Sequence, residues 1–206
     1  MKIKDPIFLK IMLLIVSSSK SINNESSAIN SLFAEGLSLF HLRKPEASLE
    51  DLRFILEGVK HEFISNIVLH QEHQLADEFG IKRIHFKENE RLKLTDDDYQ
   101  RMKKDAFVYS TSVHSFDDYL KLNHVFEYAF YGPVFESISK VGYKPKEELK
   151  TLSIKNSKVR LIGIGGVTAS NFNQVLKKEF DGVAFCGTIW ESENLIETFK
   201  EILKCK

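Results

Sequence analysis

Short runs of β-prone residues recur along this chain, and the segments between them carry apolar residues at helical spacing. Alternation of strand and helix predicts parallel pairing, because parallel neighbours need a crossover long enough to hold a helix. This rhythm restricts the fold to the α/β class. The eight expected strands are Ile11–Val16, Gly36–Leu42, Ser65–Leu69, Ile81–Phe86, Phe107–Ser110, Glu127–Tyr131, Val159–Ile164 and Gly182–Cys186.

Several of the intervening segments carry helical signals. Ser48–Lys60 and Ser192–Leu203 each place apolar residues on one face. Thr95–Lys104 opens with a threonine and three aspartates, which suit an N-cap and an acidic first turn. Ser115 is expected to cap a further helix, with Asp118 as its capping-box partner.

Eight strand–helix units could form a closed barrel or an open doubly wound sheet. The units average about 25 residues, near the minimum for a (β/α)8 barrel. The first strand is followed by Ser17–Asn24, which lacks the G-x-G-x-x-G turn of dinucleotide-binding open sheets. We therefore predict one (β/α)8 TIM barrel domain spanning residues 1–206, with its functional residues at the C-terminal ends of the strands.

The equal numbers of acidic and basic residues argue against partners that are bound through overall charge. The chain has 29 basic and 29 acidic residues, so no global field draws it to nucleic acid or an anionic membrane. Its two cysteines, Cys186 and Cys205, are too few for a disulfide framework and suit a reducing cytoplasm. Lys10 interrupts the apolar N-terminal stretch and no small-residue cleavage site follows, so we expect a buried first strand rather than a signal peptide. No stretch approaches the roughly 20 apolar residues of a membrane span.

Polar side chains follow the second, third and fourth expected strands. Alternation points His41 and Arg43 the same way, toward the barrel mouth, where Arg43 either grips an anion or forms an ion pair at the rim. His70 and His73 follow the third strand. Because helical zinc-binding pairs usually stand four residues apart, we expect these to be surface histidines at the start of a helix. His85, in the fourth strand, is expected to be a hydrogen-bonded structural residue.

His114 follows the fifth strand and is the best candidate for a general acid/base in the chain. An unperturbed imidazole has a pKa of about 6.5, so it can accept and return a proton at neutral pH. A place in the cap region of the next helix, without a catalytic role, is the simpler alternative.

The last three strands end in sequences that suit an anion. The loop after the sixth strand offers hydroxyls and a lysine, and is either a phosphate or pyrophosphate site or an ordinary polar loop. Glycines at the ends of the seventh and eighth strands could present backbone N–H groups to a phosphate. The candidate residues are Ser137, Ser139 and Lys140 after the sixth strand, Gly165 and Gly166 after the seventh, and Gly187 after the eighth.

Together these segments resemble the thiamine phosphate synthases and their relatives, the thiazole tautomerases. The resemblance spans nearly the whole chain. Its sharpest pieces are Gly132–Lys140 (GPVFESISK), the Ile164–Val167 turn (IGGV) and Ser112–Ser115 (SVHS), and His41–Arg43 is a fainter match.

The resemblance implies a (β/α)8 barrel that handles thiazole phosphate in thiamine biosynthesis. It also implies which residues surround the substrates. These are Ser137, Ile138, Ser139, Gly166, Cys186 and Gly187 at the thiazole phosphate, and Lys140 and Ser112 toward the pyrimidine diphosphate of a synthase.

The chain departs from the synthase pattern at the positions that handle pyrophosphate. The synthase run Gln-x-Arg-x-Lys ends here in Pro45, and the Asn-Asp pair whose aspartate helps to hold magnesium is Leu69 and His70. The nearest match to a second magnesium aspartate is Glu90. Leaving pyrophosphate needs its charge neutralised, and histidine is a poor magnesium ligand. The synthase chemistry is therefore expected to be impaired.

We interpret the chain as a thiazole tautomerase that needs no metal. His114 would shuttle the proton that makes the thiazole ring aromatic, while the glycine loops hold the phosphate. One alternative is a divergent synthase that uses Mg²⁺ with Glu90, Lys140 and Arg43; another is a barrel that binds thiazole phosphate without catalysis. The expected partner is a small phosphorylated thiazole, and a homo-oligomer is compatible with the sequence.

Overall fold

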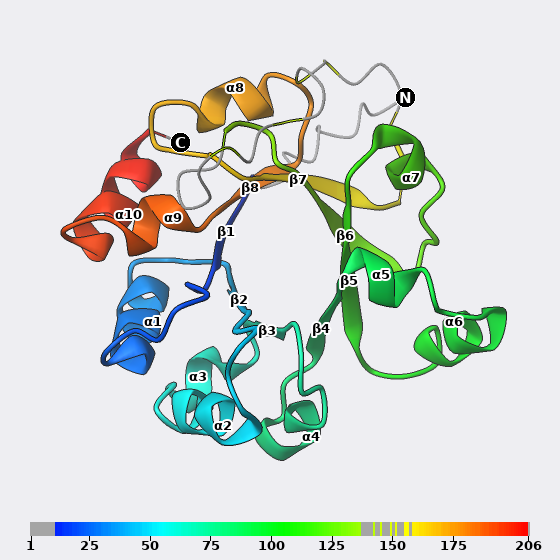
Figure 1. Cartoon of the computed structure of the whole chain (residues 1–206), viewed down its shortest axis with the longest axis horizontal. Coiled ribbons are helices and arrows are strands. Elements are labelled where there is room, and N and C mark those ends of the chain that lie inside the picture. The colour runs from blue at the N-terminus through cyan, green and yellow to red at the C-terminus, as the bar shows by residue number, and fades with distance from the viewer. Residues whose placement is uncertain are drawn as a thin grey trace, which may run out of the picture.

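Eight parallel strands close into a barrel in the order β1 to β8, as predicted (Figure 1). The computed structural model describes residues 11–136, 142, 145, 149, 151, 155–156 and 158–205. Each strand pairs with the next along the chain, and β8 pairs with β1 to complete the ring. The strands are β1 (Met12–Val16), β2 (Leu39–Leu42), β3 (Ile67–Leu69), β4 (Arg83–Phe86), β5 (Val108–Val113), β6 (Phe126–Tyr131), β7 (Arg160–Ile164) and β8 (Gly182–Phe185).

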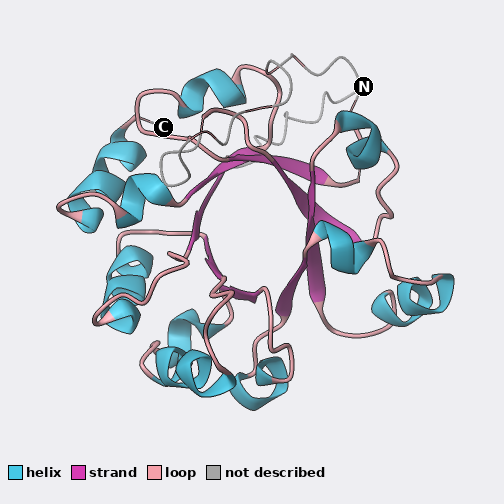
Figure 2. Ribbon diagram, in the orientation of Figure 1, coloured by secondary structure: helices cyan, strands magenta, loops and turns pink. Residues whose placement is uncertain are grey.

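Helices surround the ring of strands on its outside (Figure 2). Within the described residues none of them is long and apolar enough to cross a membrane. They are α1 (Glu25–Ala34), α2 (Leu49–Glu57), α3 (His61–Ile64), α4 (Leu75–Phe79), α5 (Glu88–Arg91), α6 (Asp96–Met102), α7 (Phe116–Leu120), α8 (Phe172–Leu176), α9 (Gly187–Trp190) and α10 (Leu195–Lys204).

The predicted helix starts are confirmed by their caps. Ser48 and Thr95 cap α2 and α6 with complete capping boxes, and the Ser115 hydroxyl accepts from the Asp118 N–H at the start of α7. Some strand boundaries differ from the prediction. β5 runs to Val113, three residues beyond the predicted end at Ser110. β2 begins three residues later than predicted, at Leu39, and β8 ends one residue earlier, at Phe185. Polar residues can extend β5 because their hydroxyls find hydrogen-bond partners, as when Thr111 donates to the Phe86 carbonyl at the end of β4.

Apolar side chains form two separate layers. The larger cluster lies between the strands and the surrounding helices and includes Phe40, Val113 and Phe185. The smaller one fills the barrel interior and includes Leu14, Phe130 and Ile162. Alternate residues of each strand thus enter opposite layers, which is the pattern of a closed barrel with a packed centre.

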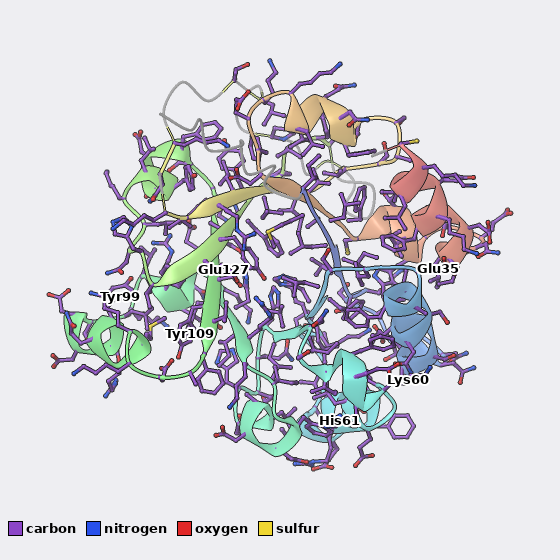
Figure 3. The ribbon with its side chains drawn as sticks, turned by 180° about the vertical axis from the view of Figure 1, so that it is seen from behind. Glu35, Lys60, His61, Tyr99, Tyr109 and Glu127 are labelled. Atoms are coloured by element: carbon purple, nitrogen blue, oxygen red, sulfur yellow. The ribbon has the colours of Figure 1, made fainter. Side chains whose placement is uncertain are left out.

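An ion-paired group lies at the N-terminal part of the barrel. Glu127, at the start of β6 (labelled in Figure 3), pairs with Arg83 from β4 and Arg160 from β7. The Arg83–Glu127 nitrogen–oxygen distance is 2.9 Å. The pairing of β5 with β6 shifts register between Tyr109 and Ser110, opposite this segment. The Glu127 carboxylate of β6 therefore connects β4 and β7 by ion pairs. These pairs lie at the end of the barrel opposite the predicted site.

Closure of the barrel depends on a close backbone approach at Gly182. This residue pairs with Met12 of β1 and with Ile162 of β7. A Cβ atom built on Gly182 would overlap the Met12 carbonyl oxygen and lie 2.8 Å from the Met12 Cβ. Only glycine lets β8 approach β1 this closely.

We expect Gly182→Ala to lower the free energy of unfolding by about 3 kcal/mol, because β1 must move to admit the methyl group. Gly80→Ala is the control. Gly80 has φ of 72° but nothing within 4 Å of an added Cβ, so only backbone strain of roughly 1–2 kcal/mol is expected. Urea unfolding of both variants measures the difference. An equal or smaller loss at Gly182 would show that closure does not depend on this contact.

Candidate active site at the barrel mouth

His114 lies directly after β5 with an exposed imidazole. Its Nδ1 is 2.7 Å from the Gly132 carbonyl oxygen in the loop after β6. Because a carbonyl can only accept, Nδ1 carries the proton and Nε2 of the neutral ring holds the lone pair. Nε2 is 4.0 Å from a carboxylate oxygen of Glu88, at the start of α5. The neighbouring loops therefore fix both the tautomer and the orientation of this imidazole.

The loop after β6 packs onto the glycine turn after β7. Val134 N–H donates to the Ile164 carbonyl and Phe135 N–H to the Gly165 carbonyl, at 2.9 and 3.0 Å. Gly165 and Gly166 have φ of 94° and 67°, and a Cβ on Gly165 would lie 2.8 Å from Pro133 Cα. Glycine is required at both positions by conformation and by space.

These contacts bring His114 and the paired glycines to the same side of the barrel mouth. Gly132, which accepts from His114, leads directly into the segment that lies on Gly165 and Gly166. The predicted juxtaposition of an imidazole with the glycine turn is thus present. The predicted phosphate residues Ser137, Ile138, Ser139 and Lys140 lie outside the described residues.

Cys186 and Gly187 lie where β8 passes into the short helix α9. The Cys186 thiol donates to the Ser17 carbonyl across the closure of the barrel, at 3.6 Å. The Thr188 hydroxyl, one residue beyond Gly187, donates to the Val167 carbonyl next to the glycine turn. The ends of β7 and β8 are therefore joined, as the prediction of a shared anion site requires.

The interior of the barrel holds three histidines, and here one sequence interpretation is wrong. His70 was expected on the surface, but only 3% of it is exposed, while His41 and His85 are fully buried. His70 follows β3 without a break, so its side chain enters the barrel instead of starting a helix; α4 begins only at Leu75. His73 is half-buried rather than exposed. His41, predicted to point toward the barrel mouth, is fully buried against the Phe130 ring in the interior.

A hydrogen bond joins His41 to His70, and ring stacking joins His70 to His85. His41 Nδ1 lies 2.8 Å from His70 Nε2, and His41 Nε2 lies 2.8 Å from the Tyr128 hydroxyl. The His70 and His85 rings stack with their centroids 4.1 Å apart. His85 contacts hydroxyl oxygens with both ring nitrogens, as expected of a structural histidine; these are Ser110 and Ser112, each at 2.9 Å. Ser112 is half-buried, so the network reaches the mouth.

Burial keeps the interior imidazoles neutral. Desolvation lowers the pKa of His85 to about 3, and the positive charge of Arg43 acts in the same direction. Desolvation also lowers the pKa of His41 and His70 well below 6.5, with repulsion from His85 next in importance. Neutral rings can each donate and accept one hydrogen bond, which suits the network.

The lowered pKa of His85 predicts a specific pH dependence of stability. Below about pH 6.5 the unfolded chain binds a proton at this residue that the native protein does not bind until about pH 3. Stability is therefore complete above pH 6.5 and falls as the pH drops. From pH 7 to pH 5 we expect His85 alone to reduce the free energy of unfolding by about 2 kcal/mol.

The measurement is denaturant unfolding of wild type, His85→Gln and His124→Gln at several pH values. His124 is exposed and precedes β6 at the other end of the barrel. His85→Gln should reduce the slope of the pH dependence, while His41 and His70 keep their share of it, whereas His124→Gln should keep the wild-type slope. The slopes are compared rather than the absolute stabilities, so a destabilised variant remains informative. Equal slopes for wild type and His85→Gln would contradict the assignment.

Two cations follow β2 in different surroundings. Arg43 is half-buried, and among the described residues no carboxylate lies within ion-pair distance of it. Its backbone is held by Ser17, whose hydroxyl exchanges hydrogen bonds with the Arg43 N–H and carbonyl at 2.8 Å. Lys44 forms a buried ion pair with Glu25 at 2.6 Å. For the ion-paired alternative of Arg43, the described residues therefore offer no carboxylate partner.

The ends of β3 and β4 do not fit a magnesium ion. Mg²⁺ requires oxygen ligands. At the end of β3 stand Leu69, whose side chain is apolar, and His70, whose imidazole is buried. Both carboxylate oxygens of Glu90 are engaged by Lys87, one through its N–H and one through its ammonium. The described residues at these positions therefore lack a free pair of carboxylates.

Comparison with known proteins gives consistent matches along the chain. The family model described as "Thiamine monophosphate synthase" matches residues 12–189. Thiamine-phosphate synthase 1 of Streptococcus pneumoniae is 23% identical over 181 residues, covering 81% of this chain and 83% of the relative. Thiamine-phosphate synthase of Lysinibacillus sphaericus is 25% identical over 147 residues, covering 68% and 67%.

Two solved structures share the barrel. A thiamine phosphate pyrophosphorylase from Bacteroides thetaiotaomicron superposes with a TM-score of 0.71 at 25% identity, covering 95% of this chain and 97% of that one. A thiamine phosphate pyrophosphorylase from Pyrococcus furiosus gives a TM-score of 0.76 with 95% of each chain covered. At 15% identity the second match supports the fold alone.

Proposed function

Because the chain belongs to the thiamine monophosphate synthase family, whose enzymes act on phosphorylated substrates, we propose that it binds thiazole phosphate at the barrel mouth and acts as a thiazole tautomerase. The observation that carries this proposal is the exposed His114 imidazole held beside the loop that covers Gly165 and Gly166. A proton shift needs one acid/base group and an anchor for the phosphate, and this arrangement offers both.

His114 has the geometry of a group that takes up and returns a proton. The Gly132 carbonyl holds the Nδ1 proton, so Nε2 is the atom that would accept a proton from the thiazole. Glu88, 4.0 Å from Nε2, would balance the charge of the imidazolium that forms. The same Nε2 would then return the proton as the ring becomes aromatic.

The phosphate would be held beside the imidazole. The turn at Gly165 and Gly166 and the junction at Cys186 and Gly187 place backbone at the ends of two neighbouring strands. Backbone N–H groups in such positions bind phosphate without a metal. Ser137, Ile138, Ser139 and Lys140 are predicted to complete this site.

The second candidate is a thiamine phosphate synthase, and the relatives' names favour it. The curated relatives compared above are named thiamine-phosphate synthases, and none is named a tautomerase. That reaction joins a pyrimidine to the thiazole phosphate and releases pyrophosphate, which the family's synthases assist with Mg²⁺. The residues at the corresponding positions do not favour a synthase. Leu69 and His70 offer no oxygen ligand to magnesium, and the Glu90 carboxylate is paired with Lys87.

We expect His114→Gln to reduce tautomerase turnover by about 10²–10⁴-fold, because glutamine cannot accept and return a proton. Thiazole phosphate affinity should change little, since the glycine turn and the β8–α9 junction are untouched. Single-turnover assays by mass spectrometry and calorimetric binding measure the two quantities.

His124→Gln is the matched control, because it alters an exposed histidine away from the barrel mouth. Its turnover should equal that of the wild type. Unchanged turnover in His114→Gln would remove His114 from the mechanism.

The synthase candidate is tested by supplying pyrimidine diphosphate and thiazole phosphate, with and without Mg²⁺, and measuring thiamine phosphate. We expect tautomerase product without metal and no thiamine phosphate in either condition. Magnesium-dependent thiamine phosphate would establish the synthase instead. Binding of thiazole phosphate without either product would favour a non-catalytic binding protein.

A further inference from the structure

We propose that His41, His70 and His85 form a binding site for one divalent transition-metal ion of the zinc class inside the barrel mouth. One ring nitrogen from each of these histidines lies within 4.8 Å of the other two. Within the described part of the chain this is the single group of three or more histidine, cysteine or carboxylate side chains that converges in this way. The proposal does not depend on the tautomerase function.

The ligand type selects the ion. Imidazole nitrogen suits zinc, copper, cobalt and nickel, whereas magnesium prefers oxygen. A tetrahedral zinc ion with bonds of about 2.0–2.1 Å keeps its nitrogen ligands roughly 3.3 Å apart. His41 Nδ1 and His70 Nε2 already face one another at 2.8 Å with one proton between them. An ion that replaces this proton requires the two nitrogens to separate by about half an ångström.

The surrounding hydroxyls would orient the ligands. A metal-binding histidine usually has its other ring nitrogen held by a hydrogen-bonding partner. The Tyr128 hydroxyl occupies this position on His41 Nε2, at 2.8 Å. Ser110 and Ser112 contact the two ring nitrogens of His85, so one of them would remain when the other nitrogen binds the ion.

The fold supports the site through three neighbouring strands. His41 and His85 belong to β2 and β4, and His70 directly follows β3 between them. Side chains on rigid strands hold a ligand set more precisely than side chains on loops. Three protein ligands leave a fourth tetrahedral position for water or another small ligand, as in open zinc sites.

The test uses the full chain without a polyhistidine tag, treated with a chelator and titrated with Co²⁺ and Zn²⁺. We expect one Co²⁺ per chain, the visible absorption of a tetrahedral cobalt site, and displacement by Zn²⁺ but not by equal Mg²⁺. His70→Asn and His85→Asn should each weaken binding at least 10-fold. Tyr128→Phe should weaken it about 10- to 100-fold, the range for losing a partner of a ligand.

His124→Asn is the control and should bind as the wild type does. Circular dichroism of each variant without metal shows whether it is folded. If the interior variants fail to fold, ¹⁵N spectra of the wild-type histidines decide, because zinc should shift His41, His70 and His85 but not His61 or His124. Absence of stoichiometric binding, or shifts confined to His61 and His124, would overturn the proposal and leave a hydrogen-bonded core. These readouts need no thiazole, so they are independent of the tautomerase test.

Discussion

Hydrogen bonding between β1 and β8 is the interaction on which the rest of the molecule depends. These strands come from opposite ends of the described chain, and their pairing from Met12 with Gly182 to Ile15 with Phe185 turns a sheet into a ring. Because all eight strands are parallel, closure brings every C-terminal strand end to one mouth. The contact of the Cys186 thiol with the Ser17 carbonyl shows how closely the two chain ends meet there.

The barrel interior is divided between an apolar and a polar part. Residues of the interior apolar cluster come mainly from β1, β6, β7 and β8, whereas the three buried histidines come from β2 to β4. Buried polar groups are costly unless they are hydrogen-bonded. Tyr128, Ser110 and Ser112 supply those bonds at distances of 2.8 to 2.9 Å. A neutral imidazole network is therefore compatible with a packed barrel.

Solvation separates the histidines into two chemical groups. His114 stands in solvent at the mouth, with its tautomer set by the Gly132 carbonyl. His41, His70 and His85 lie inside, where desolvation favours the neutral ring. The unprotonated nitrogen of a neutral ring can bind a metal ion or accept a hydrogen bond from a hydroxyl. One residue type thus occurs in two kinds of environment a few strands apart.

The sequence by itself determined the barrel, because strand–helix alternation and unit length depend only on local periodicity and on the geometry of parallel crossovers. It also located the helix caps at Thr95 and Ser115, which are set by neighbouring residues. Only the tertiary structure decided that His70 turns inward and joins His41 and His85. The meeting of side chains from three strands depends on register and closure, which no local pattern encodes.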